Sequence, residues 1–166
     1  MKKIFLFTVM TVMGVSTMAC SSDDNSSTPD YKSSIQGIWV DSKTVYLDKD
    51  RKVLGEELAD NNDGCGFGER EFKGDVATFK YPYRYIVGSI NECRNDEGTD
   101  KYEIKGNKII IESKDGDEID VEEVEIVELT SKKLVILDLE KVTESGAEGE
   151  GWPKGTVYIQ SEYVKK

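Results

Sequence analysis

Apolar side chains in this chain alternate with polar ones along many short segments, and this period of two constrains the fold more than any other feature. Alternate residues of a strand face opposite sides, whereas a helix would place apolar residues three or four positions apart. The candidate strands lie at residues 35–47, 69–72, 76–81, 83–90, 101–104, 108–112, 118–129, 133–142 and 155–164. These segments make about eight short strands.

Short turns separate the candidate strands, for example Gly74-Asp75 and Gly106-Asn107. Sequential strands with short connections favour an antiparallel meander. Closure into an eight-stranded antiparallel up-and-down barrel removes the exposed edges of such a sheet, and a two-sheet sandwich is the alternative. Pro82 requires its strand to be an edge, bulged or broken. We also expect a helical turn or two within residues 50–60, a β-bulge at Glu122-Glu123 and a loop at residues 144–151.

The first 19 residues have the pattern of a secretory signal: Lys2-Lys3, an apolar run at residues 4–15, and the small residue Ala19 before Cys20. The run is shorter than the roughly 20 residues of a spanning helix. The Ala19-Cys20 junction resembles the lipobox of bacterial lipoproteins. That resemblance implies that Cys20 is acylated, becomes the new N-terminus and anchors the chain in a membrane.

A polar stretch follows Cys20 and offers no apolar face to pack. We therefore predict a signal peptide at 1–19, a lipidated cysteine with a flexible tether at 20–34, and a β-barrel domain at 35–166. Ser21-Ser22-Asp23-Asp24 resembles the acidic export signal of Bacteroidota surface lipoproteins. The resemblance implies an outer-membrane lipoprotein at the cell surface, with retention on the periplasmic face as the alternative.

Acidic residues outnumber basic ones, 33 against 22, and removal of Lys2 and Lys3 with the leader takes the net charge from −11 to −13. This charge opposes binding to nucleic acids and to anionic head groups. The chain has no histidine, which excludes Ser–His and Cys–His nucleophiles and His-ligated zinc. No carboxylate pair stands out as a candidate for acid–base catalysis, and we expect that the protein is not an enzyme. We also expect a monomer that holds no cofactor.

Two further sites concern metals and cysteines. Oxygen ligands for a metal are offered by Asp60, Asn61, Asn62 and Asp63, but their spacing is not that of an EF-hand. A turn rich in Asx residues explains the cluster better, so no metal is expected.

If Cys20 carries lipid, Cys65 and Cys93 remain as an even pair, which in an exported protein indicates a disulfide. A metal site at these cysteines is the weaker alternative, since they lack Cys-x-x-Cys spacing.

The order of several motifs resembles the lipocalin-like domains of small Bacteroidota lipoproteins. They are Gly37-Ile38-Trp39, a cysteine before a strand with a Phe, a second cysteine before the strand-turn-strand at residues 102–111, Leu129-Thr130, and a final strand with Tyr158 and Tyr163. The resemblance implies an eight-stranded barrel whose bottom is closed by Trp39, with a small hydrophobic ligand inside. The aromatic candidates for lining such a cavity are Trp39, Phe79, Tyr81, Tyr83 and Tyr85, and ordinary core or edge packing is the alternative for them.

A second function class remains open on the same fold. A tethered barrel without a small ligand could present its loops to another protein or to a glycan. The candidate loops are residues 60–68 and 144–152, and Trp152 beside Pro153 is either an exposed contact or a buried plug.

Overall fold

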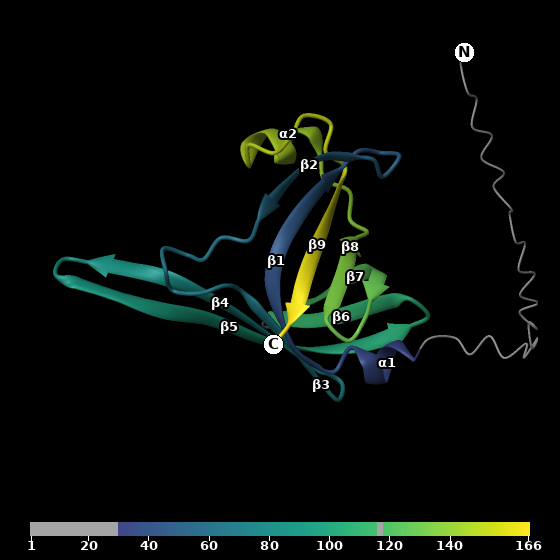
Figure 1. Ribbon diagram of the computed structural model, residues 1–166, viewed down its shortest axis with the longest axis horizontal. Coiled ribbons are helices and arrows are strands. Elements are labelled where there is room, and N and C mark those ends of the chain that lie inside the picture. The colour runs from purple at the N-terminus through teal and green to yellow at the C-terminus, as the bar shows by residue number, and fades with distance from the viewer. Residues whose placement is uncertain (1–29, 116–117) are drawn as a thin grey trace, which may run out of the picture.

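The computed structural model describes residues 30–115 and 118–166, so the leader, Cys20 and all but the last residues of the predicted tether lie outside the described residues. The described part holds nine strands and two short helices (Figure 1). In chain order they are α1 (Tyr31–Ser34), β1 (Gly37–Leu47), β2 (Val53–Leu58), β3 (Glu69–Lys73), β4 (Val76–Val87), β5 (Ile90–Lys105), β6 (Lys108–Asp115), β7 (Glu118–Leu129), β8 (Lys133–Asp138), α2 (Glu144–Gly149) and β9 (Tyr158–Lys165).

All nine strands belong to one antiparallel sheet, and β1 also pairs with β9, so that eight strands close into a barrel. β2 is the additional strand and pairs with β1 alone. The predicted all-β class and the eight-stranded up-and-down barrel are therefore confirmed, and the sandwich alternative is not what forms.

β1 changes its partner halfway along its length. Its first residues, Gly37 to Val40, pair with β3, whereas Lys43 to Leu47 pair with β2. On the other side β9 follows β1 throughout, with a register shift between Asp41 and Lys43 that leaves Ser42 as an extra residue. Such a bulge bends and twists a strand. The bend leaves an opening between β2 and β3, where Asp41 N donates to Gly68 O at 2.9 Å.

The core fills the end of the barrel next to α1. Trp39 is fully buried there, and its Nε1 donates to Ile35 O at 2.6 Å. Phe72 and Tyr102 pack edge to face with ring centroids 5.1 Å apart. The remaining buried members come from β4, β6, β7, β8 and β9. α1, with Asp30 as its N-cap, continues directly into this core, and Tyr31 packs against it. α1 lies within the segment that the sequence assigned to the tether.

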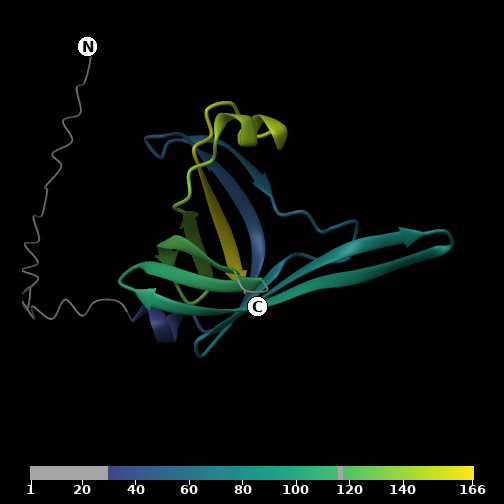
Figure 2. The same cartoon turned by 180° about the vertical axis from the view of Figure 1, so that it is seen from behind.

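β4 and β5 extend beyond the barrel as a long hairpin (Figures 1 and 2). β3 pairs with β4 only as far as Lys80, and β6 pairs with β5 only from Lys101. The outer part of the hairpin therefore has two free edges. Pro82 lies in this part and pairs with Asn95 in an uninterrupted register. Its strand is therefore neither bulged nor broken there but has a free edge, which is one of the three arrangements predicted for it.

The predicted disulfide forms. Cys65 in the β2–β3 loop is bonded to Cys93 on β5, with 5.4 Å between the Cα atoms. The Cys65–Cys93 bond fastens the loop to the middle of the projecting hairpin, where Cys93 pairs with Arg84, and Arg84 Nη2 donates a hydrogen bond of 2.6 Å to Asp63 O. The loop is therefore held in place by one contact to β4 and one to β5.

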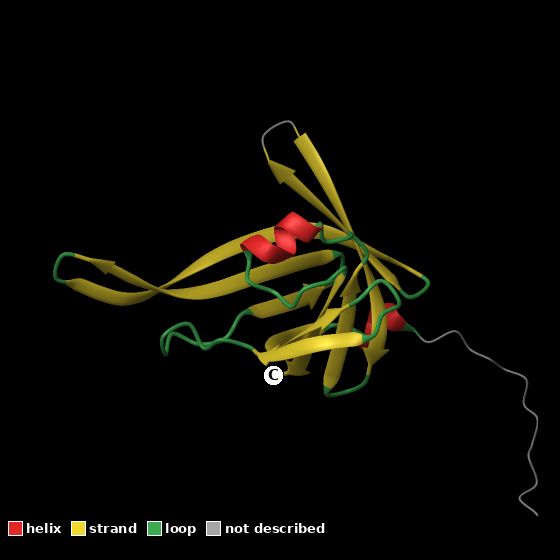
Figure 3. Cartoon of the chain, turned by 90° about the horizontal axis from the view of Figure 1, so that it is seen from above, coloured by secondary structure: helices red, strands yellow, loops and turns green. Residues whose placement is uncertain are grey.

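Three local expectations are wrong. Residues 53–58 form β2 instead of a helical turn, because their backbone pairs with Lys43 to Leu47 of β1. The register of β7 is continuous through Glu122-Glu123, and the bulge lies at Val127, between Ile126 and Glu128. Residues 144–149 form α2 instead of a loop, because Thr143 caps it by accepting from Gly146 N. α2 lies at the end of the barrel opposite to α1 (Figure 1), and Figure 3 shows the molecule from the α2 end.

Candidate functional site

A cavity of about 470 Å³ lies at the opening where β1 leaves β3 for β2. Its lining residues come from β1, β3, β4 and β9, and from the end of β2 with the β2–β3 loop. Its lining is mostly polar and includes Asp41, Thr44, Arg70, Tyr81, Ser161 and Tyr163. This composition differs from the predominantly apolar lining of most small-molecule pockets.

Arg70 is the central charged group of this cavity. On β3 it pairs with Trp39 on one side and with Phe79 on the other, so its side chain points to the core face of the sheet. Its Cζ atom lies 4.9 Å from the Phe79 ring centroid and 5.3 Å from the Tyr163 ring centroid. The guanidinium is therefore held between two aromatic rings, each of which attracts a cation through its π face.

The guanidinium of Arg70 lacks polar partners. Its Nε and Nη1 atoms are buried and have no hydrogen-bond partner, although part of the side chain reaches the cavity surface. Within the described ranges, no ion pair of 4.0 Å or less joins Arg70 to a carboxylate. Burial opposes the charged form, but Tyr163, Tyr81, Glu122 and Asp41 outweigh it and raise the pKa of Arg70. The group is therefore a cation in the folded protein.

Asp41 is the acidic neighbour of Arg70 on β1. Burial raises the pKa of its carboxyl, and the charge of Arg70 partly opposes that shift. Gly68 leaves space for this carboxyl, because a Cβ atom there would lie only 3.1 Å from Asp41 Cγ. Burial also raises the pKa of Tyr163 to about 12, so its hydroxyl stays protonated at neutral pH and can donate a hydrogen bond.

Glu122 faces the barrel interior from β7, opposite the core residue Ile111. Partial desolvation raises the pKa of its carboxyl, with Arg70 opposing the shift. The side chain of Glu122 is nevertheless exposed, so water reaches its carboxyl group.

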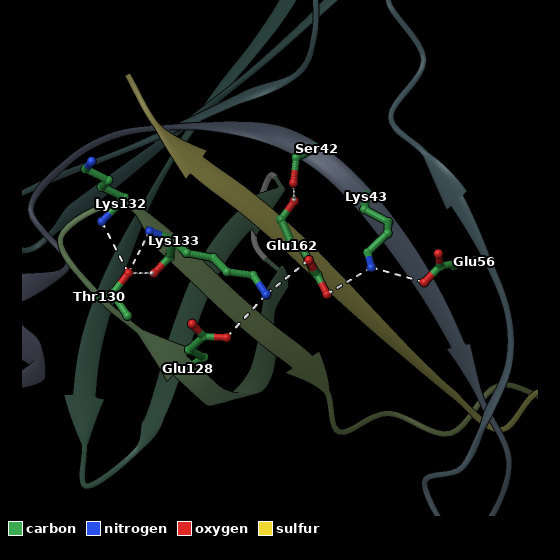
Figure 4. Close-up of polar contacts among 8 residues, drawn as sticks. All are labelled: Ser42, Lys43, Glu56, Glu128, Thr130, Lys132, Lys133 and Glu162. Carbon is green, nitrogen blue, oxygen red and sulfur yellow. Dashed lines mark hydrogen bonds and ion pairs between the residues drawn. The ribbon is translucent and has the colours of Figure 1, made fainter.

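A chain of ion pairs runs across β2, β1, β9, β8 and β7 on the face of the sheet that points away from the barrel interior (Figure 4). Lys43 Nζ lies 3.0 Å from Glu56 and 3.5 Å from Glu162, and Lys133 Nζ lies 3.2 Å from both Glu162 and Glu128. Ser42 Oγ donates to Glu162 O at 2.9 Å, which ties the bulge to β9. These contacts join β1 to β9 on the outer face of the sheet, and two of the residues, Lys43 and Glu162, also line the cavity.

The predicted aromatic residues separate into three groups. Trp39 is wholly inside the core, with Lys165 Nζ 4.8 Å from its ring centroid. Tyr81 lines the cavity and Phe79 packs against Arg70. Tyr83 and Tyr85 lie on the projecting hairpin, where Arg94 Cζ is 3.5 Å from the Tyr85 ring centroid. Of the predicted aromatic residues the structure thus brings Tyr81 to the cavity, with Phe79 behind Arg70. It adds Arg70, Asp41 and Tyr163, which the sequence did not identify as cavity residues.

The two predicted interaction loops have internal structure. In the first, Asp60 and Asn61 accept hydrogen bonds from Asn62 N and Gly64 N at 2.9 and 2.7 Å, as expected of Asx turns. In the second, Trp152 is half-buried and packs on Tyr46 with ring centroids 5.7 Å apart. Trp152 therefore contributes to closing the barrel end near α2. Among the described helices, neither has the length and apolarity needed to cross a membrane.

Comparison with known proteins agrees with this architecture. Residues 35–136 match the family model of a lipocalin-like domain, which covers β1 through most of β8. A search of curated proteins found no match to the chain. The matched segment contains the Gly37-Ile38-Trp39 opening, both cysteines and the cavity residues Asp41, Arg70 and Tyr81. The chain therefore belongs to the lipocalin-like domain family.

Proposed function

We propose that this protein binds a small amphipathic molecule in the cavity beside Arg70 while a lipid on Cys20 anchors it to the outer membrane. The observation that carries the proposal is the combination of a cavity of about 470 Å³ with a buried guanidinium that has unpaired nitrogens. A closed eight-stranded barrel is of the size that holds one small ligand. Membership of the lipocalin-like family supports a binding role and gives no support to a catalytic one.

The lining favours a ligand with both polar and apolar parts. Arg70 and Asp41 offer charged contacts, whereas the rings of Tyr81 and Tyr163 and the side chains of Leu58 and Ala59 offer apolar ones. The expected small hydrophobic ligand therefore needs a polar group that can reach the guanidinium, because a purely apolar molecule would leave it unpaired.

The anchor is proposed from the sequence. The basic leader, the apolar run and Ala19-Cys20 support acylation of Cys20, and Ser21-Ser22-Asp23-Asp24 supports exposure at the cell surface. Retention on the periplasmic face is the alternative. The tether joins the barrel at α1, beside the end that Trp39 fills, and so the loops around α2 and β2 lie at the far end from the point of attachment (Figure 1).

Binding is tested with an environment-sensitive fluorescent fatty-acid analogue, followed by competition with a lipid extract of the native envelope. Two β4 variants form a matched pair, since Tyr81 lines the cavity and Tyr83 lies on the hairpin. We expect Tyr81→Ala to weaken binding at least fivefold and Tyr83→Ala to leave it unchanged. Absence of saturable binding to the unaltered protein contradicts the proposal.

One observation favours a second candidate, an interaction protein that contacts a protein partner through the β4–β5 hairpin. The hairpin tip exposes Ile86, Val87 and Ile90, at 65%, 53% and 48% of their surfaces. Aliphatic groups exposed together are typical of contact sites. Capture of a partner from the envelope that is lost in Ile86→Ser and kept in Val121→Ser, at an equally exposed site on β7, supports this candidate. Recovery of the chain alone contradicts it.

A further inference from the structure

We infer that Arg70 binds the carboxylate of a monocarboxylic molecule whose apolar body occupies the cavity. This inference rests on the proposed binding function and names the chemical class of the ligand. A guanidinium presents its N–H groups in a planar fork that matches a carboxylate, so one such group can satisfy two donors at once. Arg70 lines the cavity, and within the described ranges no carboxylate pairs with it, so a ligand carboxylate there would meet an unpaired cation.

The position of Arg70 is fixed before any ligand arrives. Backbone pairing on both edges of β3 sets its place between Trp39 and Phe79, and the rings of Phe79 and Tyr163 flank the guanidinium. A cation held in this way loses little conformational freedom on binding an anion. Preorganisation of this kind raises affinity by lowering the cost of ordering the site.

The unpaired state of Arg70 is energetically unfavourable for folding. A buried donor without a partner destabilises the folded state, and the effect is larger when the donor belongs to a charged group. An apolar side chain of similar size at this position would avoid the cost of burying an unpaired charge. An arginine that weakens the fold in this way fits a binding role better than a structural one.

The other charged and titratable groups near Arg70 favour a single negative charge on the ligand. The charged residues that line the cavity with Arg70 are Asp41, Lys43, Glu57, Asp60 and Glu162. Carboxylates therefore outnumber cations in this lining, and they repel a second negative charge on the ligand. A phosphate monoester, which carries close to two charges at neutral pH, is repelled more strongly than a carboxylate.

The apolar part of the ligand has a route into the site. The cavity opens between the β2–β3 loop and β1, and the Cys65–Cys93 bond keeps that loop in place. Tyr81 lies on the path with 46% of its surface exposed. An alkyl chain leaving Arg70 along Tyr81 covers the apolar atoms of Leu58 and Ala59 on the opposite side.

The test is calorimetric titration of the chain from residue 20 onward, carrying C20S to remove the acyl chain, with octanoate, 1-octanol and octyl phosphate at pH 7. We expect octanoate to bind at least tenfold more tightly than the alcohol or the phosphate. In Arg70→Met, octanoate affinity should fall to that of the alcohol, while the melting temperature stays equal or rises. Arg70→Lys should recover only part of the octanoate affinity, because it keeps the charge and loses the fork.

Arg94→Met is the matched control, because Arg94 also lies over a tyrosine ring but sits outside the cavity. Octanoate affinity should be unchanged in this variant. Equal binding of octanoate and 1-octanol, or an Arg70→Met variant that keeps full octanoate affinity, overturns the carboxylate inference and leaves the proposed binding function in place. If none of the probes and no fluorescent fatty-acid analogue binds the unaltered chain, both fall.

Discussion

Lys165 Nζ lies 4.8 Å from the centroid of the Trp39 ring, directly across the β1–β9 pairing that closes the barrel. The two residues come from the first and last strands of the barrel. The ammonium covers one face of the indole, and Trp39 itself is fully buried. A cation over a tryptophan ring contributes about 0.5–2 kcal/mol. This contact joins the two ends of the domain at the closed end of the barrel.

Gly37 makes room for this contact, which leads to the first prediction. Its φ is +116°, and a Cβ atom there would meet Lys165 Cε at 3.1 Å. Gly37→Ala should therefore lower the free energy of unfolding by about 2 kcal/mol through backbone strain and displacement of Lys165. Urea unfolding followed by tryptophan fluorescence measures the change. Gly98→Ala is the control, because nothing lies within 4 Å of the added atom and its φ is outside the positive range, so its stability should be unchanged or slightly higher.

The second prediction concerns the Cys65–Cys93 bond. It joins residues 28 apart in the sequence, so its loss should destabilise the domain by about 3.6 kcal/mol in the chain-entropy model. The double variant Cys65→Ala/Cys93→Ala should also release the β2–β3 loop and raise amide hydrogen exchange in residues 60–68. Comparison of the unaltered protein with and without a reductant should give the same difference in stability. Identical unfolding midpoints in both comparisons are incompatible with a structural role for the bond.

The third prediction is a pH dependence that belongs to Asp41. Burial raises the pKa of its carboxyl above the ordinary value of 3.8, so between the two values the folded state binds more protons than the unfolded state. The contribution of Asp41 to stability is therefore fully present below pH 3.8 and is lost as the pH rises through the folded-state pKa. Asp41→Asn removes this loss. The variant should gain stability relative to the unaltered protein as the pH rises from 4 to 7, measured by urea unfolding at each pH. A difference that stays constant across this range contradicts the assignment.

The fourth prediction tests the anchor. The chain recovered from its native envelope should begin at Cys20 and carry the mass of a diacylglyceryl group, which intact-mass spectrometry detects. Cys20→Ser should move the protein from the membrane fraction to the soluble fraction, because stable anchoring requires the acyl chains. Protease treatment of intact cells then separates the surface location, where the domain is degraded, from the periplasmic face, where it is protected. An unmodified thiol at Cys20 refutes the anchor.

Much of the barrel follows from alternation of apolar residues, because a half-buried strand leaves that pattern in its sequence. β6, β8 and β9 lie within or close to their predicted bounds. β5 was largely missed, since residues 91–100 are polar and form a strand only by pairing with β4 outside the barrel. β2 was mistaken for a helical turn because Val53, Leu54 and Leu58 fit a helical spacing as well as an exposed edge strand.

The site was less predictable than the fold. The aromatic residues of β4 share a face by simple alternation, but the sequence does not say where β4 leaves the barrel, so Tyr83 and Tyr85 could not be separated from Tyr81. A signal for Arg70 did exist, because it lies two positions before the buried Phe72 and so shares its face. Its contact with Tyr163 depends on closure of the barrel, and the electrostatic influence of Asp41 depends on the path of β1 around the bulge at Ser42, which no local pattern specifies.

Binding of a carboxylate at Arg70 is tested most directly by native mass spectrometry of the protein purified from its own envelope, together with identification of any small molecule it releases. We expect one bound monocarboxylic molecule per chain, retained in Arg94→Met and lost in Arg70→Met. A protein that carries nothing, or that retains the same neutral molecule in both variants, contradicts it.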